Sequence, residues 1–183
     1  YGIATSLGQE PLEVLRIISE LKHVAGRFEH LRSRNGRTAI IDYAHTPDAL
    51  ENVLDTIAAF RNGKQIITVV GCGGDRDKEK RPKMAAIAAS KSQQVIFTSD
   101  NPRSEDPLQI IAAMEAGVKD ADQHKIFTVV DRLQAIKMAI VMSQPDDIIL
   151  IAGKGHETYQ EINGIRTPFD DVATTQNLFN QLD

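Results

Sequence analysis

An acid, an amide, a proline and an arginine stand side by side in "SDNPRSED", residues 99–106, directly after a short apolar run. Pro102 restricts its own φ angle and keeps Asn101 extended, so the neighbouring side chains form a stiff array. An arginine fork binds a carboxylate through two hydrogen bonds, and an aspartate together with an amide can hold an ammonium group. Asp100, Asn101 and Arg103 are therefore complementary to the zwitterionic end of an amino acid.

Two glycine-containing segments could also approach a ligand closely, "GCGGDRDKEKRP" from Gly71 and "AGKGHE" from Ala152. The first fails the dinucleotide-binding pattern G-x-G-x-x-G because Arg76 stands at the third glycine, and the P-loop pattern G-x-x-x-x-G-K-[ST] is absent from the sequence. A solvated turn explains the charges from Asp77 to Lys80, while Arg76 stays a candidate for binding. The second segment is equally compatible with an ordinary strand-to-loop turn.

The five histidines and the single cysteine show no metal-like clustering, so the sequence predicts no metal site. Cys72 is interpreted as a small buried side chain rather than a nucleophile. His45 and His156 lie in loops that follow strand-like runs. A catalytic triad or a carboxylate pair cannot be argued from spacing, because such partners need only meet in space.

Strands and helices alternate behind these segments. Short runs rich in Ile and Val are typical of strands that are covered on both faces of a parallel sheet. Strands are expected at 38–42, 65–70, 94–98, 125–130 and 147–152, with helices over 47–61, 79–92, 107–118, 132–143 and 171–181. Thr46, Asp106 and Asp131 mark helix starts, the last two with Gln109 and Gln134 placed to close capping boxes.

This alternation predicts an α/β fold, a Rossmann-like three-layer α/β/α sandwich with a mostly parallel sheet. Ligands bind such sheets at the carboxyl ends of the strands. The five strands lead into "DYAHTPD", "GCGGDRD", "SDNPRSED", "VDRLQ" and "AGKGHE", four of which are dense in charge and glycine. Helix capping in the third loop needs only Asp106, so Asp100, Asn101 and Arg103 remain for a ligand.

An amphipathic helix is expected upstream, over residues 10–21, followed by an N-terminal antiparallel hairpin. Asn35-Gly36 is expected to supply the positive φ angles of a tight turn in that hairpin. A domain boundary is placed near residues 30–34. Because the chain begins with Tyr1 rather than methionine, we expect it to be part of a longer protein.

The composition suits one globular domain with a short extra segment: 183 residues, 42% hydrophobic and 25% charged. A formal net charge of -4 gives no reason to expect nucleic acid or an anionic membrane as partner. No apolar run approaches the length that spans a bilayer. A single cysteine does not suggest a secreted scaffold, so we expect a cytoplasmic protein.

The motifs "GRFE", "DYAHTPDAL", "GCGGDRDKEKRP", "DNPR", "AGKGHE" and "FDD", in this order over nearly the whole chain, resemble the C-terminal part of the Mur ligases. The resemblance implies an ATP-dependent acid–amino-acid ligase of peptidoglycan precursor synthesis, in which ATP converts a carboxylate to an acyl phosphate that an amine then attacks. It is greatest to the members that add meso-2,6-diaminopimelate to UDP-N-acetylmuramoyl-L-alanyl-D-glutamate. Residues 1–32 would be the tail of the central ATPase domain, and residues 33–183 the C-terminal Rossmann-like domain that brings the amino acid.

The resemblance also assigns the recognition of meso-diaminopimelate to a set of residues. One amino-acid end of this substrate reacts, so the other end remains a zwitterion. Lysine lacks the far carboxylate, and lysine-adding relatives lack the arginine of the motif, so substrate choice would rest on Arg103. The implied set is Arg76, Asp100, Asn101, Pro102, Arg103, Gly153 and Glu157.

For the nucleotide, the resemblance implies that Arg27 is a catalytic residue near the ATP phosphates and that Asp42 and His45 face ATP. Lys154 and His156 would line the same cleft. ATP and Mg²⁺ are the implied cofactors, bound mainly by the central domain, whose phosphate loop, magnesium ligands and modified lysine are not in this chain; the UDP-sugar domain is also outside it. We therefore expect the chain alone to be inactive.

Two alternatives remain open. The first is another amino-acid ligase domain, from a lysine-adding Mur ligase or a folylpolyglutamate synthetase. The second is a non-catalytic Rossmann-like module that binds an amino acid or a nucleotide.

Overall fold

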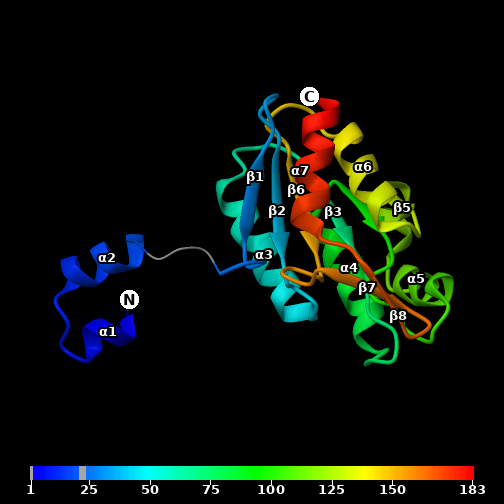
Figure 1. The fold of residues 1–183 in the computed structure, drawn as a ribbon, viewed down its shortest axis with the longest axis horizontal. Coiled ribbons are helices and arrows are strands. Elements are labelled where there is room, and N and C mark those ends of the chain that lie inside the picture. Colours follow the sequence, from blue (N-terminus) through cyan, green and yellow to red (C-terminus); the bar gives the residue numbers. More distant parts are fainter. Residues whose placement is uncertain (1, 21–23) are drawn as a thin grey trace.

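The structure, a computed structural model, describes residues 2–20 and 24–183. Its main body is a six-stranded sheet with helices on both faces, and the short helices α1 (Gly2–Ser6) and α2 (Pro11–Glu20) lie apart from that sheet (Figure 1). In the described ranges, no helix has the length and apolar character needed to cross a membrane.

The strand order of the sheet is β1-β2-β6-β3-β4-β5. Only β1 (Glu29–Arg32) is antiparallel to its neighbour, and all other pairs are parallel. The parallel strands are β2 (Thr38–Asp42), β3 (Ile66–Val70), β4 (Gln94–Phe97), β5 (Ile126–Thr128) and β6 (Ile148–Ala152). The predicted α/β fold with a mostly parallel sheet and an N-terminal antiparallel pair is confirmed.

The helices divide between the two faces of the sheet. One face is covered by α3 (Pro47–Phe60), α4 (Lys80–Lys91) and α5 (Pro107–Glu115), and the other by α6 (Arg132–Met142) and α7 (Asp171–Leu182). Successive strand residues alternate between the two cores, so Ile40 packs on one face and Ile41 on the other. Each fully buried aliphatic side chain of this kind contributes about 2 kcal/mol. Because the strands are buried on both faces, their sequences are continuous apolar runs.

The helix starts follow local sequence. The side chains of Thr46, Asp106 and Asp131 each accept a hydrogen bond from a backbone N–H in the first turn of the following helix. In the described chain, the side chains of Gln109 and Gln134 return no hydrogen bond, so the expected capping boxes are not formed.

The turn between β1 and β2 differs from the expected tight hairpin. Residues 33–37 form a longer loop in which Gly36 has a φ of 89°, whereas the φ of Asn35 is not positive. The cause is tertiary, because Asp183 at the end of α7 accepts hydrogen bonds from the backbone N–H of Arg34 and from the Asn35 side chain.

The structure also contains elements without a predicted counterpart. The hairpin of β7 (Tyr159–Ile162) and β8 (Ile165–Pro168) forms a separate two-stranded sheet, and a 3-10 helix, η1 (Asp120–Lys125), precedes β5. The strand expected at 125–130 and the helix expected at 107–118 are both shorter in the structure. Strand β8 is exposed and β7 is mostly half-buried, and neither contributes to the two hydrophobic cores, so the hairpin has little apolar periodicity.

Candidate functional site

A cleft of about 470 Å³ opens at the carboxyl edge of the sheet. Its walls come from the loops after β2, β3, β4 and β6, together with β7. Because β6 lies between β2 and β3, this is the place where successive connections change faces, the usual ligand crevice of such sheets. Of the predicted site residues, seven line it: His45, Arg76, Asp100, Asn101, Arg103, Gly153 and Glu157. Sequence reasoning missed the other lining residues, Tyr43, Thr46, Gly71, Gly73, Asp77, Lys80 and Tyr159.

The glycines after β3 let two loops approach each other. A Cβ at Gly74 would collide with the carbonyl of Pro102, and a Cβ at Gly71 would collide with the carbonyl of Thr98. The Gly74 N–H donates to the carbonyl of Asn101 at 2.9 Å. The glycines therefore serve loop-to-loop packing rather than a phosphate cradle.

An ion pair ties the same two loops to α4. Arg81, which is buried, donates to both carboxylate oxygens of Glu105 at 2.8 and 3.0 Å. The Arg81 guanidinium, followed by the backbone N–H of Asp75, lowers the pKa of Glu105 to about 2. A bidentate pair of this kind fixes geometry as well as charge. The two residues lie far apart in sequence, and no local pattern indicated that they would meet.

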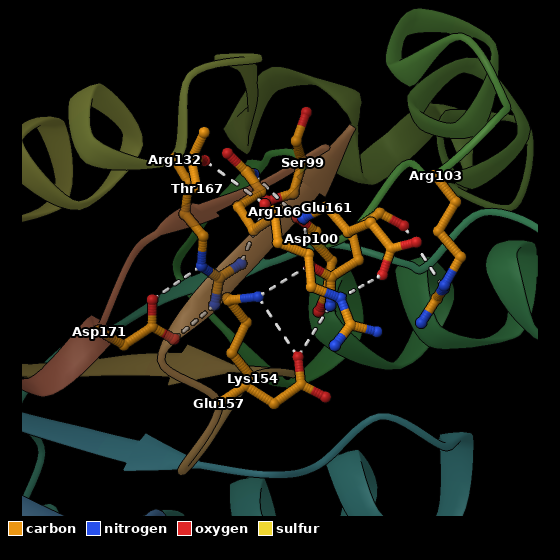
Figure 2. A network of polar contacts seen from close by, with 12 residues as sticks. Ser99, Asp100, Arg103, Arg132, Lys154, Glu157, Glu161, Arg166, Thr167 and Asp171 are labelled. Carbon is orange, nitrogen blue, oxygen red and sulfur yellow. Dashed lines mark hydrogen bonds and ion pairs between the residues drawn. The ribbon is translucent and has the colours of Figure 1, made fainter. Parts of the chain in front are cut away.

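A second ion pair lies behind the cleft. Arg132 at the start of α6 and Asp171 at the start of α7 are both fully buried and share two hydrogen bonds of 2.8 Å (Figure 2). Burial lowers the pKa of the Arg132 guanidinium, but the Asp171 carboxylate raises it, and the net result is a raised pKa. Arg132 also donates to the carbonyls of Ala152 and Ser99, which end or follow strands β6 and β4. This pair holds the loops after those two strands together.

Asn101 is the centre of a buried polar network. Its Oδ1 accepts from the Lys154 ammonium at 3.1 Å and from the Glu161 N–H at 2.9 Å, while its Nδ2 donates to Glu157 Oε2 at 2.8 Å. Lys154 also pairs with Glu157 at 3.3 Å (Figure 2). The expectation that Lys154 lines the cleft was wrong, because it is fully buried behind these partners.

Asp100 presents a buried carboxylate to the cleft. Its side chain has no hydrogen-bond partner among the described residues, and burial raises its pKa, against the opposing charges of Arg132 and Lys154. Gly153 has a φ of 116°, and a Cβ there would stand 2.6 Å from Asp100 Oδ2. A buried carboxylate with unmet hydrogen-bonding capacity favours a cationic donor from a ligand.

Arg103 supplies positive charge to the same cleft. It has a φ of 52°, and its Nη1 donates to the Gly74 carbonyl at 2.7 Å. Its backbone is held by β7 and the turn after it, donating to Glu161 and accepting from Asn163. The exposed Arg76 also lines the cleft, whereas Pro102 is buried and shapes the loop from behind. Carboxylates and guanidinium groups thus line one cleft, which is the combination of charges complementary to a zwitterion.

An aromatic cluster flanks the cleft at the end of β2. The Tyr43 ring lies 4.5 Å from that of His45 and 5.0 Å from that of His156, centroid to centroid. The Arg27 guanidinium lies 4.8 Å from the centroid of the same tyrosine ring. Asp42 does not line the cleft; its Oδ2 accepts from the backbone N–H that follows Arg27. Of the three residues expected to face ATP, only His45 reaches the cleft wall.

Within residues 2–20 and 24–183, no three or more His, Cys, Asp or Glu side chains are placed to hold a metal ion, so we assign none of them to magnesium. Cys72 is buried in the core, and this burial raises its pKa to about 12. Such a thiol is not ionised near neutral pH, so the geometry does not support a nucleophilic role.

Comparison with known proteins identifies the family. Residues 26–155 match the family described as "Mur ligase, glutamate ligase domain". A relative from Phocaeicola vulgatus, named "UDP-N-acetylmuramoyl-L-alanyl-D-glutamate--2,6-diaminopimelate ligase", is 54% identical over 180 residues, covering 98% of this chain and 37% of the relative. A relative of the same name from Bacillus licheniformis is 52% identical over 165 residues, covering 90% of this chain and 33% of the relative.

Solved structures agree with this assignment. A structure of a protein of that name is 42% identical, superposes with a TM-score of 0.80, and is matched over 98% of this chain and 36% of its own. A folylpolyglutamate synthase from Thermotoga maritima is only 21% identical, with a TM-score of 0.57 over 82% of this chain and 32% of its own, and shares the fold alone. The chain thus spans about 37% of the length of the first of these curated relatives.

Proposed function

Because this chain belongs to the Mur ligase family, we propose that it forms the C-terminal, amino-acid-binding part of an ATP-dependent ligase. The ligase adds meso-2,6-diaminopimelate to UDP-N-acetylmuramoyl-L-alanyl-D-glutamate in peptidoglycan precursor synthesis, the reaction that the names of the relatives describe. The segment up to residue 32 contains the tail of the central domain, although its last strand, β1 (Glu29–Arg32), already pairs with β2 in the sheet of the C-terminal domain. Residues 33–183 belong to the C-terminal domain. The enzyme works in the cytoplasm.

One observation carries the choice of amino acid. Asp100 and Glu157 stand in the same cleft as Arg103 and Arg76, so both halves of a zwitterion have a partner there. Diaminopimelate retains such a zwitterionic end after its other amine has reacted. Lysine has no carboxylate at that end, so it would forgo the charge-assisted hydrogen bonds that Arg103 and Arg76 offer to diaminopimelate.

In the proposed reaction, the free amine of the bound diaminopimelate attacks the carbonyl carbon of the acyl phosphate. The new C–N bond forms, the C–O bond to phosphate breaks, phosphate leaves with the electron pair, and the amine loses a proton to solvent. Asp100 and Glu157 hold the distal ammonium, and Arg103 and Arg76 hold the distal carboxylate. Their contribution is orientation, which converts an encounter of two molecules into an effectively intramolecular step.

ATP and Mg²⁺ are held mainly by the central domain in this proposal. From this chain, Arg27 places its charge beside the transferring phosphate, and His45 and His156 stand at the nucleotide side of the cleft. Asp42 acts by holding the backbone next to Arg27. A guanidinium near a transferring phosphoryl group stabilises the charge that develops on it.

The test is Arg103→Ala in the full-length ligase, assayed with meso-diaminopimelate and with L-lysine. The expected result is a fall in kcat/KM for diaminopimelate on the order of 100-fold, because a desolvated carboxylate loses its partner. Arg34→Ala is the matched control, since Arg34 is exposed in the loop at the opposite edge of the sheet. If the wild type used L-lysine as efficiently as meso-diaminopimelate, and Arg103→Ala changed neither kcat/KM, the proposed substrate would be wrong.

A further inference from the structure

We propose that Lys154 is a positioning residue for the amino-acid site. It holds Asn101 and Glu157 in one arrangement, so that Glu157 presents its free carboxylate oxygen, beside Asp100, to the ammonium end of the substrate. The inference rests on the proposed function and deepens it, because it assigns a role to a side chain that does not reach the cleft.

The position of Lys154 requires explanation because the side chain is fully buried. A buried ammonium is strongly disfavoured unless acceptors surround it. Its Nζ lies 3.1 Å from Asn101 Oδ1, 3.3 Å from Glu157 Oε2 and 5.6 Å from the centroid of the Tyr159 ring. In Figure 2 the lysine and the glutamate point toward each other. Every one of these three partners lines the cleft.

Lys154 decides the orientation of the Asn101 amide. Oδ1 of Asn101 receives two hydrogen bonds, from the lysine ammonium and from the backbone N–H of Glu161. Neither group can accept a hydrogen bond, so the flipped amide would place donors against donors. The Nδ2 group must therefore point at Glu157 Oε2, where it donates at 2.8 Å.

The two carboxylate oxygens of Glu157 therefore have different roles. Oε2 is occupied by Asn101 and Lys154, whereas Oε1 has no hydrogen-bond partner in the described part of the chain. The carboxylate of Asp100, which likewise has no hydrogen-bond partner among those residues, lines the same cleft. Two carboxylates with free acceptors are what an ammonium group with three donors needs.

Lys154 also compensates the charge of this pair. Burial raises the pKa of Asp100, and Arg132 and then Lys154 oppose that rise. Two neighbouring carboxylates without a cation beside them tend to retain one proton between them. The charged or titratable groups that surround the pair are Arg132 and Asp171 behind it, Tyr159 with Arg166 on the hairpin, and Arg76, Arg103, Lys80 and Tyr43 around the cleft.

The test is Lys154→Met in the full-length ligase, by steady-state kinetics across the neutral to alkaline range. KM for meso-diaminopimelate should rise about 10- to 100-fold, since a charge-assisted network is lost. KM for ATP and kcat at saturating diaminopimelate should change less than about threefold. KM should also rise more steeply than in the wild type as pH falls, because the substrate ammonium binds the ionised carboxylate of Asp100, and without Lys154 one of the charges that oppose the raised pKa of Asp100 is lost.

Two variants control this test. Lys154→Arg keeps the charge and should restore the shallow pH dependence. Lys137→Met, on an exposed position of α6, should leave all parameters unchanged.

A double-mutant cycle keeps the test decisive even if Lys154→Met folds poorly. In Glu157→Gln the lysine has no carboxylate to position, so adding Lys154→Met should raise KM for diaminopimelate less than about threefold further. Removing both charges also avoids leaving either one buried alone. The inference would be overturned if Lys154→Met raised KM for diaminopimelate as much in the Glu157→Gln background as in the wild type. It would also be overturned if Lys154→Met changed KM for ATP and kcat as much as it changed KM for diaminopimelate. The proposed function would stand in both cases. If the wild type forms no amide with diaminopimelate, the proposed function fails and this inference fails with it.

Discussion

The carboxylate of Asp100 is buried and has no hydrogen-bond partner in the described residues. Without a ligand this arrangement opposes folding, because taking an ionised group out of water is costly. With an ammonium group in the cleft, the same feature favours binding. Proteins commonly accept such local instability at sites that recognise ligands.

Asp100→Asn should therefore stabilise the chain at neutral pH. Because the folded pKa of Asp100 lies above the usual 3.8, the free energy of unfolding falls as pH rises from about 3.8, and the destabilisation is complete above the folded pKa. Below about 3.8 both the folded and unfolded states carry the proton, and the gain from the substitution should disappear. The measurement is Tm by circular dichroism over a pH series.

Asp131→Asn is the control for this series, because asparagine also caps a helix and Asp131 is exposed. A Tm of Asp100→Asn that stays at or below the wild type at neutral pH would contradict the interpretation. Asp100→Asn should also weaken the binding of meso-diaminopimelate, since one carboxylate partner of the substrate ammonium is lost.

At the scale of elements, the site depends on contacts that hold loops rather than on regular structure. The β7–β8 hairpin pairs with the backbone of Arg103 on one strand and supplies Tyr159 to the cleft. Behind it, Arg132 links the ends of two strands to Asp171 on α7. The hairpin and α7 therefore support the proposed amino-acid site from outside the main sheet and from its second face.

Asp171→Ala should destabilise the chain by about 3–5 kcal/mol, because it leaves the buried Arg132 charge without a counter-ion. The neighbouring Asp170 serves as a matched comparison, since its side chain only caps α7. Asp170→Ala should cost about 1 kcal/mol. Urea unfolding of the two variants measures the difference, and equal losses would argue against a structural role for the buried pair.

At the scale of the whole molecule, the cleft lies at one edge of the sheet, and in the proposed enzyme the groups that bind the nucleotide come mainly from the central domain. Four loops of the carboxyl edge contribute to it, and His45 lines it, while Arg27 and His156 pack against the Tyr43 ring. In the proposed enzyme, closure against the central domain completes the site, as domain closure does in many enzymes.

The isolated chain should accordingly show no ATP-dependent amide synthesis with the full substrate set. It should still recognise the amino acid, so titration with meso-diaminopimelate should shift the backbone amide signals of Arg76, Asn101, Arg103, Gly153 and Glu157 in NMR spectra. L-lysine in parallel should shift them far less. Measurable turnover by the chain alone would overturn the proposed domain assignment, and equal shifts with both amino acids would contradict the selectivity.

Local sequence was sufficient for the five parallel strands, for most helices and for the edge of the sheet that carries the cleft. Apolar runs and capping residues act over a few positions, so Thr46, Asp106 and Asp131 begin helices where the sequence predicts them. The polar loops follow the strands, and parallel strands bring their carboxyl ends to one edge. "SDNPRSED" was recognisable as a candidate ligand loop because Asp100, Asn101 and Arg103 exceed what helix capping requires, and these three residues line the cleft.

Only the tertiary structure decided which charges are buried and which partners they have. Lys154 lies behind the cleft, while Lys80, interpreted from the sequence as part of a solvated run, lines it. Arg132 with Asp171, like Asp183 with the loop after β1, pairs residues that are distant in the chain. Burial and ion pairing depend on which surfaces meet after the chain has folded, and no local pattern of residue types contains that information.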